Sequence, residues 1–397
     1  MNDLLALVLI SVLKVLVVVI VVLTAVAYLT WFERKVVAHM QSRWGPERVG
    51  PYGLLQPLCD GAKFLFKEDP TPEGVDRTVY VLAPFLALAL GLSSIAVIPL
   101  GPGHIDIFGY RTWFSIAEVD VSLLVVFAVT ALGVYGVALA GWASNSKYPL
   151  LGGIRSTAQM LSYELSLTLS VVGVVLLTNT FSLREIVEAQ RGGILHWFAM
   201  PHRQILGFVC FMISGVAETN RSPFDLVEAE QELVGGFHTE YASFKFAMFF
   251  MAEYAAMISV SLMVSVLFLG GYLSPFPDTP MFHWTYYIAP AAALIGGATL
   301  LYHGLRYHTL FGRLVLPVIS LVLIGLGVLF ALPAVSPWIQ GPFWLITKVF
   351  CFLFFYVWLR GTLPRIRYDQ LMAFGWKFLL PLSLANVVLT SFAVAVR

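Results

Sequence analysis

The side chains best suited to chemistry are carboxylates gathered in residues 218–240, a stretch that lies between two strongly apolar segments. It holds six of the 23 acidic residues of the chain, and Arg221 is its only lysine or arginine. Carboxylates crowded together where water is scarce hold protons near neutral pH, so a stretch of this kind is suited to accepting and releasing protons. The alternative is a fully ionised acidic loop that contacts a basic partner protein.

A helix beginning at Pro223, which suits a first-turn position, separates these acids by face. At about 100° per residue, Asp225, Glu228 and Glu232 fall on one side of such a helix, and Glu230 points away from them. We therefore expect Glu230 to behave differently from the other three.

Two more glutamates lie inside apolar segments, where a charge costs about 2.5 to 3.5 kcal/mol at the bilayer centre. Glu164 lies about two turns from one end of its segment, and Glu253 lies about 15 Å deep by helix rise. A structural ion pair needs a basic partner at the same depth, and the sequence offers few. Together with Glu218 and the acidic stretch, these residues are interpreted as a chain of carboxylates of the kind from which proton paths are built.

The composition is that of a membrane protein with many spans. The chain has 397 residues, of which 59% are hydrophobic and 12% charged, and no soluble domain needs so much apolar surface. A net charge of +1 argues against a nucleic-acid-binding protein. The three cysteines lie far apart and the eight histidines show no ligand spacing, so we expect no metal site.

We predict an all-α polytopic protein, a single integral membrane domain over residues 1–397 with about ten transmembrane helices. The apolar segments are 4–31, 79–100, 117–140, 158–179, 204–217, 244–270, 286–303, 314–333, 342–360 and 371–394. The fifth is short. Ten spans place both termini on the same side of the membrane.

Basic residues predict the orientation. Fifteen lysines and arginines fall in the loops on one side and five in the loops or terminus on the other, so the first side is predicted to be cytoplasmic and both termini periplasmic. Lys348 and Lys377, near the ends of their segments, are expected to extend toward the membrane interface.

The first cytoplasmic loop, residues 34–78, contains a predicted amphipathic helix at 54–67. Its apolar side chains fall within about 120° of one another, and its charged ones lie opposite. We interpret it as a helix at the membrane surface that floors a cavity open to lipid; the alternative is a helix packed on the spans with no ligand nearby. The apolar face consists of Leu54, Leu55, Leu58, Ala62, Leu65 and Phe66, and the opposite face of Asp60, Lys63 and Lys67.

Several blocks of residues, in order along nearly the whole chain, carry a resemblance to a known family. The sequence resembles the H subunit of proton-pumping NADH:quinone oxidoreductase, respiratory complex I, known in mitochondria as NADH dehydrogenase subunit 1. Besides residues 218–240, the blocks are 33–35 (ERK), 40–46 (MQSRWGP), 49–57 (VGPYGLLQP), 66–68 (FKE), 141–148 (GWASNSKY), 162–164 (SYE), 249–254 (FFMAEY) and 360–372 (RGTLPRIRYDQLM).

One departure from the family is clear. The family core has eight spans, whereas residues 274–341 of this chain are predicted to insert a hairpin of two more. A hairpin preserves the orientation of the spans after it, and its connecting loop, with Arg306 and Arg313, independently satisfies the charge rule.

The resemblance implies a subunit of a bacterial inner-membrane translocase that carries no cofactor itself. NADH, FMN and iron–sulfur clusters would be on other subunits, and quinone (ubiquinone or a relative) would be the substrate. The implied partners are the hydrophilic-arm subunits that complete the quinone site, the antiporter-like membrane subunits and the lipid bilayer, with no nucleic acid.

The resemblance also implies roles for individual residues. The proton-coupling acids would be Glu164, Glu218, Asp225, Glu228, Glu230, Glu232 and Glu253, with residues 218–243 forming an acidic cytoplasmic loop. The quinone chamber and its route would be lined by Glu33, Arg34, Arg43, Leu54, Leu55, Leu58, Asp60, Lys63, Phe66 and Arg221. Contacts with partner subunits would come from Arg360, Arg365, Arg367 and Asp369.

Three other interpretations stay open. The acids within the spans also suit a stand-alone ion transporter. The same architecture would suit the equivalent subunit of a membrane-bound hydrogenase-type complex that passes electrons to another acceptor. A purely structural anchor is the third.

Overall fold

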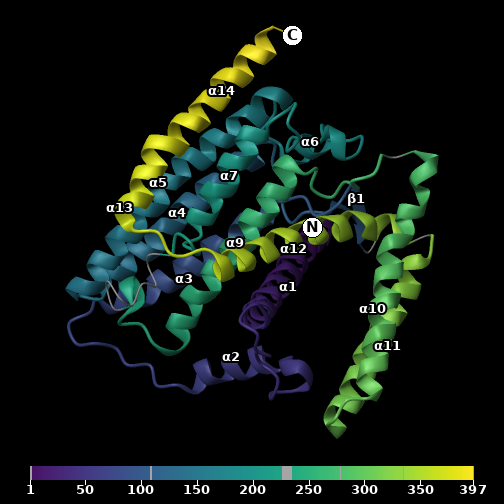
Figure 1. Ribbon diagram of the computed structural model, residues 1–397, viewed down its shortest axis with the longest axis horizontal. Coiled ribbons are helices and arrows are strands. Elements are labelled where there is room, and N and C mark those ends of the chain that lie inside the picture. The colour runs from purple at the N-terminus through teal and green to yellow at the C-terminus, as the bar shows by residue number, and fades with distance from the viewer. Residues whose placement is uncertain (1, 108–109, 226–234, 278, 334, 397) are drawn as a thin grey trace.

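The computed structural model describes residues 2–107, 110–225, 235–277, 279–333 and 335–396. Within them the chain is a bundle of long helices, with one helical hairpin beside the bundle and one small pair of strands (Figure 1). The α-helices are α1 (Asn2–Met40), α2 (Gln56–Phe66), α3 (Arg77–Ser93), α4 (Ser122–Ala143), α5 (Lys147–Thr178), α6 (Leu183–Glu188), α7 (Ile205–Glu218), α9 (Ser243–Phe268), α10 (Ile288–Leu305), α11 (Leu310–Ala331), α12 (Ser336–Thr362), α13 (Tyr368–Phe374) and α14 (Leu380–Ala395).

The remaining elements are short. They are the single-turn helices η1 (Pro51–Gly53), η2 (Ser94–Val97), η3 (Ile194–His196), η4 (Gly236–His238), the longer η5 (Pro280–Tyr287), the π-helical turn η6 (Gly375–Leu379), and the antiparallel strands β1 (His104–Ile107) and β2 (Tyr110–Trp113).

Nine helical segments of the described residues are long and apolar enough to cross a membrane. Helix α7, with 14 residues, corresponds to the short fifth apolar segment of the sequence and brings the number of segments to ten. A helix satisfies its own backbone hydrogen bonds, which is why apolar runs of this length form helices in lipid. The prediction of an all-α protein with many membrane spans is confirmed.

Two boundaries differ clearly from the prediction. Helix α1 continues to Met40 rather than ending near residue 31, and α5 begins at Lys147 rather than near residue 158. Both extensions are polar turns that hydropathy alone assigns to loops. As a result Glu33, predicted at the end of a span, lies within α1, and Glu164 lies well inside α5.

Small residues bring the central helices together. A Cβ atom on Gly136 of α4 would lie 2.8 Å from Cβ of Ala87 on α3, and one on Gly141 would lie 2.6 Å from the carbonyl oxygen of Pro149 on α5. Such close approach is how helices associate in membranes, where the hydrophobic effect does not drive them together. Helix α9 is the most buried span and packs against α3, α12 and α1.

Helix α2 lies across the lower end of α1 in Figure 1, as expected for a surface helix, and none of its residues is buried. The strands β1 and β2 lie at the other end of α1, where Lys14 donates hydrogen bonds to Thr112 and to the carbonyls of Trp113 and Ser115. The sequence did not predict these strands. Lys348 is also buried rather than extended toward the interface.

Candidate functional site

Five charged or polar side chains from four separate segments meet near the α2 end of the bundle. They are Glu33 of α1, Arg221 of the turn after α7, Glu253 and Tyr254 of α9, and Arg360 of α12, and we call them the Glu33–Arg221 cluster. Glu33 and Arg221 are only 5% and 4% exposed. Charged groups buried this deeply persist only when they are paired.

Arg221 lies between the two acids of the cluster. Its Nη1 is 3.9 Å from Oε1 of Glu33, and its Nη2 is 3.8 Å from Oε2 of Glu253. The guanidinium also lies 4.1 Å from the ring centre of Tyr254, a cation–π contact. Arg360 pairs with Oε1 of Glu33 from the other side. Two arginines therefore balance two carboxylates, and Arg221 is shared between them.

The turn that carries Arg221 is held by a buried amide. Nε2 of Gln159, on α5, donates 2.9 Å hydrogen bonds to the carbonyl oxygens of Ala217 and Phe224, on either side of the turn. Asn220 within it has a positive φ of 49°, a conformation that asparagine tolerates better than most residues. The geometry of the turn thus aims Arg221 back into the bundle.

Asp225, at the end of the same turn, is buried and pairs with Arg365, whose Nη2 lies 3.1 Å from Oδ2 of the acid. The backbone N–H of Ile366 also donates to the carbonyl oxygen of Pro223. These contacts join the turn to the segment after α12.

His238, in η4, is a titratable group near this turn. Burial lowers the pKa of His238, an effect that a backbone hydrogen bond and the charge of Asp225 partly oppose.

A cavity of about 100 Å³ lies between α3, α4, α5, α7 and α9 and contains both Glu218 and Glu253 in its wall. Because one water needs about 10 to 15 Å³ measured in this way, the cavity has room for several. Other polar atoms in its wall belong to Ser94, Thr130, Thr219, Asn220 and Ser259. We call it the central cavity.

Glu253 belongs to both the Glu33–Arg221 cluster and the central cavity, so the two are continuous. Oε2 of Glu218 has no hydrogen-bond partner among the described residues, and Glu218 is close enough to Glu164 for their charges to interact. The structure therefore brings Glu33, Glu253, Glu218 and Glu164 into one sequence of neighbouring acids.

The predicted quinone-route residues of α2 and its flanks lie at the surface. Arg34 pairs with Asp60, Nη1 to Oδ2, at 2.7 Å, and this contact joins α1 to α2. Leu54 and Leu55 are half-buried, whereas Leu58 and Phe66 are exposed. Lys63 and Arg43 are also exposed, and Nε of Arg43 donates to Gln41 rather than to any acid of the cluster.

The residues expected to contact partner subunits divide into two groups. Arg360 and Arg365 pair with Glu33 and Asp225 of this same chain. Arg367 pairs with Asp369, Nε to Oδ1, at 2.9 Å, and both side chains of that pair are largely exposed.

Three predicted acids, Glu228, Glu230 and Glu232, lie outside the described residues. The face assignment made for them stays a prediction. The expected helix start at Pro223 is wrong, because Pro223 lies in the turn between Arg221 and Asp225. A proline suits a first helical turn, but it suits a turn equally well.

Sequence reasoning missed Tyr254 and Gln159. The hydroxyl of Tyr254 donates a 2.7 Å hydrogen bond to Oε2 of Glu33, and Gln159 holds the turn described above. The sequence did contain a signal for Gln159. It is an amide inside an apolar segment, and a buried amide needs hydrogen-bond partners at the same depth.

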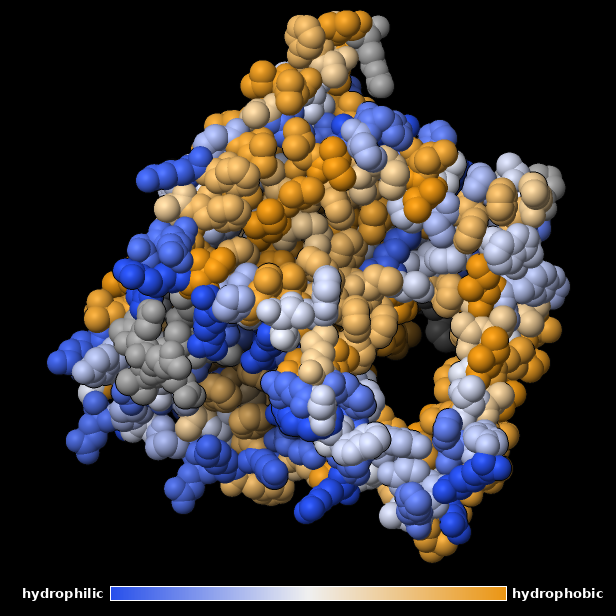
Figure 2. All heavy atoms as spheres, in the orientation of Figure 1, coloured by the Kyte–Doolittle hydropathy of each residue, from blue (hydrophilic) through white to orange (hydrophobic). Residues whose placement is uncertain are grey.

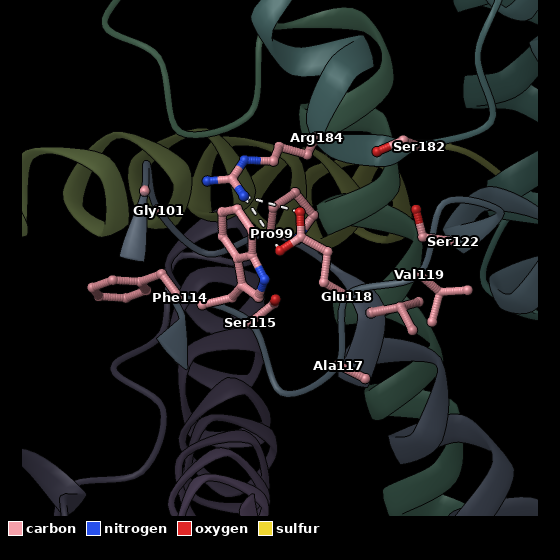
Figure 3. Close-up of a pocket in the computed structure, with 13 residues that line it drawn as sticks. Pro99, Gly101, Phe114, Ser115, Ala117, Glu118, Val119, Ser122, Ser182 and Arg184 are labelled. Atoms are coloured by element: carbon pink, nitrogen blue, oxygen red, sulfur yellow. Dashed lines mark hydrogen bonds and ion pairs between the residues drawn. The ribbon is translucent and has the colours of Figure 1, made fainter. Parts of the chain in front are cut away.

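A second polar constellation lies at the opposite end of α1, about 28 Å away by helix rise between Lys14 and Glu33. Figure 3 shows Arg184 and Glu118 facing one another across a small cavity, with a distance of 2.9 Å between Nη1 and Oε1. The cavity measures about 20 Å³ and has room for about one water. The guanidinium of Arg184 also stacks on the ring of Trp113 in β2. We therefore interpret these contacts as structural ones that hold the β1–β2 segment against the bundle.

The arrangement of acids suits proton transfer. Within the described residues, no group of three histidine, cysteine, aspartate or glutamate side chains is placed to hold a metal ion. Carboxylates that share arginines and border a cavity of water size can exchange protons with one another and respond to a change in nearby charge.

Comparison with known proteins gives the family context. Residues 13–391 match the family model described as NADH dehydrogenase. An H subunit of NADH-quinone oxidoreductase from Solibacter usitatus is 49% identical over 98% of this chain and 97% of its own length. An H subunit from Koribacter versatilis is 47% identical over the full length of both chains, and one from Thermomicrobium roseum is 44% identical over 92% of this chain and 90% of its own.

Proposed function

The chain belongs to the NADH dehydrogenase family and is similar along its whole length to H subunits of NADH-quinone oxidoreductase, and we propose that it couples quinone reduction to proton translocation within complex I. It is a membrane subunit of an oxidoreductase complex. In this proposal NADH, FMN and iron–sulfur clusters belong to other subunits, so this chain alone holds only part of the active machinery.

The observation that carries the proposal is the continuity of the acids through Glu253. One side of Glu253 faces Arg221 and the Glu33–Arg221 cluster, and the other borders the central cavity with Glu218. A change of charge at the α2 end of the bundle therefore alters the electrostatic environment of Glu253, whose carboxylate also borders the central cavity.

The proposed sequence of events begins with the substrate. Quinone, arriving from the bilayer, passes α2 and the surface residues Arg34, Arg43, Leu54, Leu55, Leu58, Asp60, Lys63 and Phe66. Reduction of quinone to quinol takes up protons as well as electrons. That demand alters the protonation of Asp225, Glu228, Glu230 and Glu232, and the altered charge repositions Arg221 between Glu33 and Glu253.

The second half of the sequence runs inward. When Arg221 moves toward one carboxylate, the other loses its counter-charge and its affinity for a proton rises. Glu253 and Glu218 then exchange protons across the central cavity, which both border. Glu218 passes the change to its neighbour Glu164, and from there it reaches antiporter-like subunits. The partners proposed for the α2 end are hydrophilic-arm subunits. Arg367 and Asp369 are largely exposed, and we propose that they contact these subunits.

We propose a bacterial inner membrane as the location, with α2 on the cytoplasmic side and both termini in the periplasm. Support comes from the loop charges, fifteen basic residues against five. The protein itself is a multi-pass membrane protein.

The test uses the intact complex in sealed vesicles and follows NADH-driven quinone reduction and proton uptake together. Replacing Glu253 or Glu218 with glutamine keeps the size of the side chain and removes its proton exchange. We expect proton uptake to fall at least about fivefold, a conservative bound because loss of a general acid or base typically costs about 100-fold or more, and Glu253→Asp to retain part of it.

Glu118→Gln is the matched control, since Glu118 pairs with Arg184 at the opposite end of the bundle. It should leave both activities within about twofold of the unaltered complex, as expected for an ion pair remote from the chemistry. Full proton uptake in Glu253→Gln and Glu218→Gln would contradict the proposal.

A further inference from the structure

The inserted hairpin formed by α10 and α11 is a tightly packed unit. A Cβ atom on Gly297 would lie 2.6 Å from Cγ1 of Ile324, and one on Gly304 would lie 2.7 Å from Cβ of Leu316. The hydroxyl of Ser320 donates a 2.7 Å hydrogen bond to the carbonyl oxygen of Gly297. The two helices therefore support one another and behave as one stiff rod.

This rod stands apart from the bundle along its middle. Figure 1 shows α10 and α11 beside α1 and α12, and Figure 2 shows an open window between the hairpin and the body of the protein. At its base the hairpin is tied to α12, where Nε2 of Gln340 donates to the carbonyl oxygen of Tyr286 in η5. Its tip is tied to a different part of the chain.

The tip contact is made by Tyr307, in the loop between α10 and α11. Its hydroxyl accepts a 3.0 Å hydrogen bond from the backbone N–H of Tyr52, and the two rings meet edge to face with centres 5.0 Å apart. Tyr307 is itself held, because Nε of Arg313 donates to its carbonyl oxygen at 2.7 Å. The contact is therefore specific in both geometry and direction.

Tyr52 belongs to η1, the turn that leads into α2. Its φ of 53° lies in the left-handed region, which a tyrosine rarely adopts without external support. The carbonyl oxygen of Tyr52 accepts a hydrogen bond from Nε1 of Trp31 on α1. The turn thus connects α1 to the hairpin tip, and it closes the lower side of the window.

Helix α2 depends on contacts of this kind because it has no buried residue. Its carboxyl end is tied by the hydroxyl of Ser243, which donates to the carbonyl oxygens of Phe64 and Lys67. Its middle is tied by the pair between Arg34 and Asp60. The amino end receives its support through Tyr52.

We propose that the inserted hairpin is a strut, and that Tyr307 at its tip is a positioning residue that clamps the η1 turn and so sets the position of α2 at the quinone route. The role in quinone access rests on the proposed function; the clamp itself rests only on the contacts of Tyr307 and Tyr52. The hairpin is joined to the bundle at both ends, so it braces the turn from outside the bundle.

The experiment compares Tyr307→Phe and Tyr307→Ala with Tyr302→Phe in the intact complex. Tyr302 is an exposed tyrosine of α10 whose hydroxyl contacts Arg306 rather than the η1 turn, and it serves as the matched control. Amide hydrogen exchange of residues 49–56 measures the clamp directly. NADH-driven reduction of decylubiquinone, with KM and kcat measured separately, reports on quinone access.

We expect exchange in residues 49–56 to accelerate about tenfold in Tyr307→Ala, with a smaller increase in Tyr307→Phe and none in Tyr302→Phe. KM for decylubiquinone should rise about threefold or more in Tyr307→Ala while kcat stays within about twofold, because access changes and chemistry does not. Tyr307→Phe keeps the ring, so it is the conservative variant should Tyr307→Ala fail to assemble.

Each contrary result points to one part of the proposal. Unchanged exchange in both Tyr307 variants overturns the clamp. Faster exchange with unchanged KM overturns the positioning role in quinone access. The proposed function has its own check: an azido-quinone should label α2 in the unaltered complex, and labelling elsewhere only would mean that quinone does not pass α2, whatever Tyr307 does.

Discussion

The hydroxyl of Tyr254 donates a 2.7 Å hydrogen bond to Oε2 of Glu33, and this bond joins the most buried helix, α9, to α1. Glu33 receives its remaining contacts from arginines, so Tyr254 is the neutral donor that completes its coordination. The same ring supports the guanidinium of Arg221. The side chain of Tyr254 thus positions both Glu33 and Arg221.

Replacing Tyr254 with phenylalanine should keep the cation–π contact and remove the hydrogen bond. We expect a loss of about 2 kcal/mol in stability, the usual value for a hydrogen bond to a charged group. The measurement is the midpoint of thermal unfolding of the purified complex, and quinone reduction should fall along with it. Tyr135→Phe, at an exposed tyrosine of α4, is the control and should unfold like the unaltered complex.

Arg221 should be far more sensitive than the surface arginines. Arg221→Met leaves Glu33 and Glu253 facing one another with less counter-charge, and removing one partner of a buried ion pair costs about 3 to 5 kcal/mol. We expect little assembled complex on a native gel. Arg221→Lys keeps the charge but loses the forked guanidinium that reaches both acids. The amount of assembled complex should therefore lie between those of Arg221→Met and the unaltered complex.

A second change distinguishes this explanation from simple misfolding. Adding Glu253→Gln to Arg221→Met removes one of the stranded charges and should restore part of the assembled complex. Arg191→Met is the matched control, since that arginine is largely exposed and pairs with Glu188 rather than with the cluster. Equal loss of assembly in Arg221→Met and the double variant would argue against charge as the cause.

The sequence predicted the spans and the surface helix correctly, because apolar length and periodicity are local properties. The roles of the acids stay predictions. It did not predict that Glu33 lies inside a helix, because α1 continues beyond its apolar run through turns that contain charged residues and that hydropathy scores as a loop. Lys348 was expected to extend toward the interface, yet the end of α9 supplies carbonyl acceptors that hold it inside.

Pairings between distant segments were the least predictable part of the site. Nothing in the local sequence of Tyr254 or Arg360 indicates that both meet Glu33, since those contacts depend on how α9 and α12 pack against α1. The tip contact between Tyr307 and Tyr52 is of the same kind, spanning 255 positions of the chain. Such pairs depend on tertiary packing, and local sequence patterns do not show which distant residues will meet.

Lys348 supports a prediction about stability. Its Nζ donates to the carbonyl oxygens of Leu269, Gly271 and Leu273 at 2.7 to 2.8 Å, and these carbonyls lie at and beyond the end of α9. Lys348→Met would leave them without these donors. We expect a loss of about 3 kcal/mol, since hydrogen bonds to a charged group contribute more than neutral ones.

The matched control for Lys348 is Lys377→Met, at an exposed lysine of η6. Thermal unfolding of the purified complex should separate the two variants, with the midpoint of Lys377→Met unchanged. A midpoint for Lys348→Met equal to that of the control would mean that other donors replace the lysine at the end of α9.

His238 leads to a prediction about pH. Burial lowers its pKa below the ordinary value of 6.5, so the folded protein binds the proton less tightly than the unfolded chain does. Its contribution to stability is therefore present above pH 6.5 and is lost as the pH falls from 6.5 through the lowered pKa. We expect the thermal unfolding midpoint of the complex to drop on acidification, in part through this residue.

His238→Asn removes the titrating group while keeping a polar side chain of similar reach, so its midpoint should depend less on pH below 6.5 than that of the unaltered complex. His202→Asn is the control, because His202 is an exposed histidine outside this part of the fold. The difference between the two variants isolates His238 from the other groups that titrate in this range. Identical pH dependence in both would mean that protonated His238 is accommodated in the folded state, where the charge of Asp225 favours it.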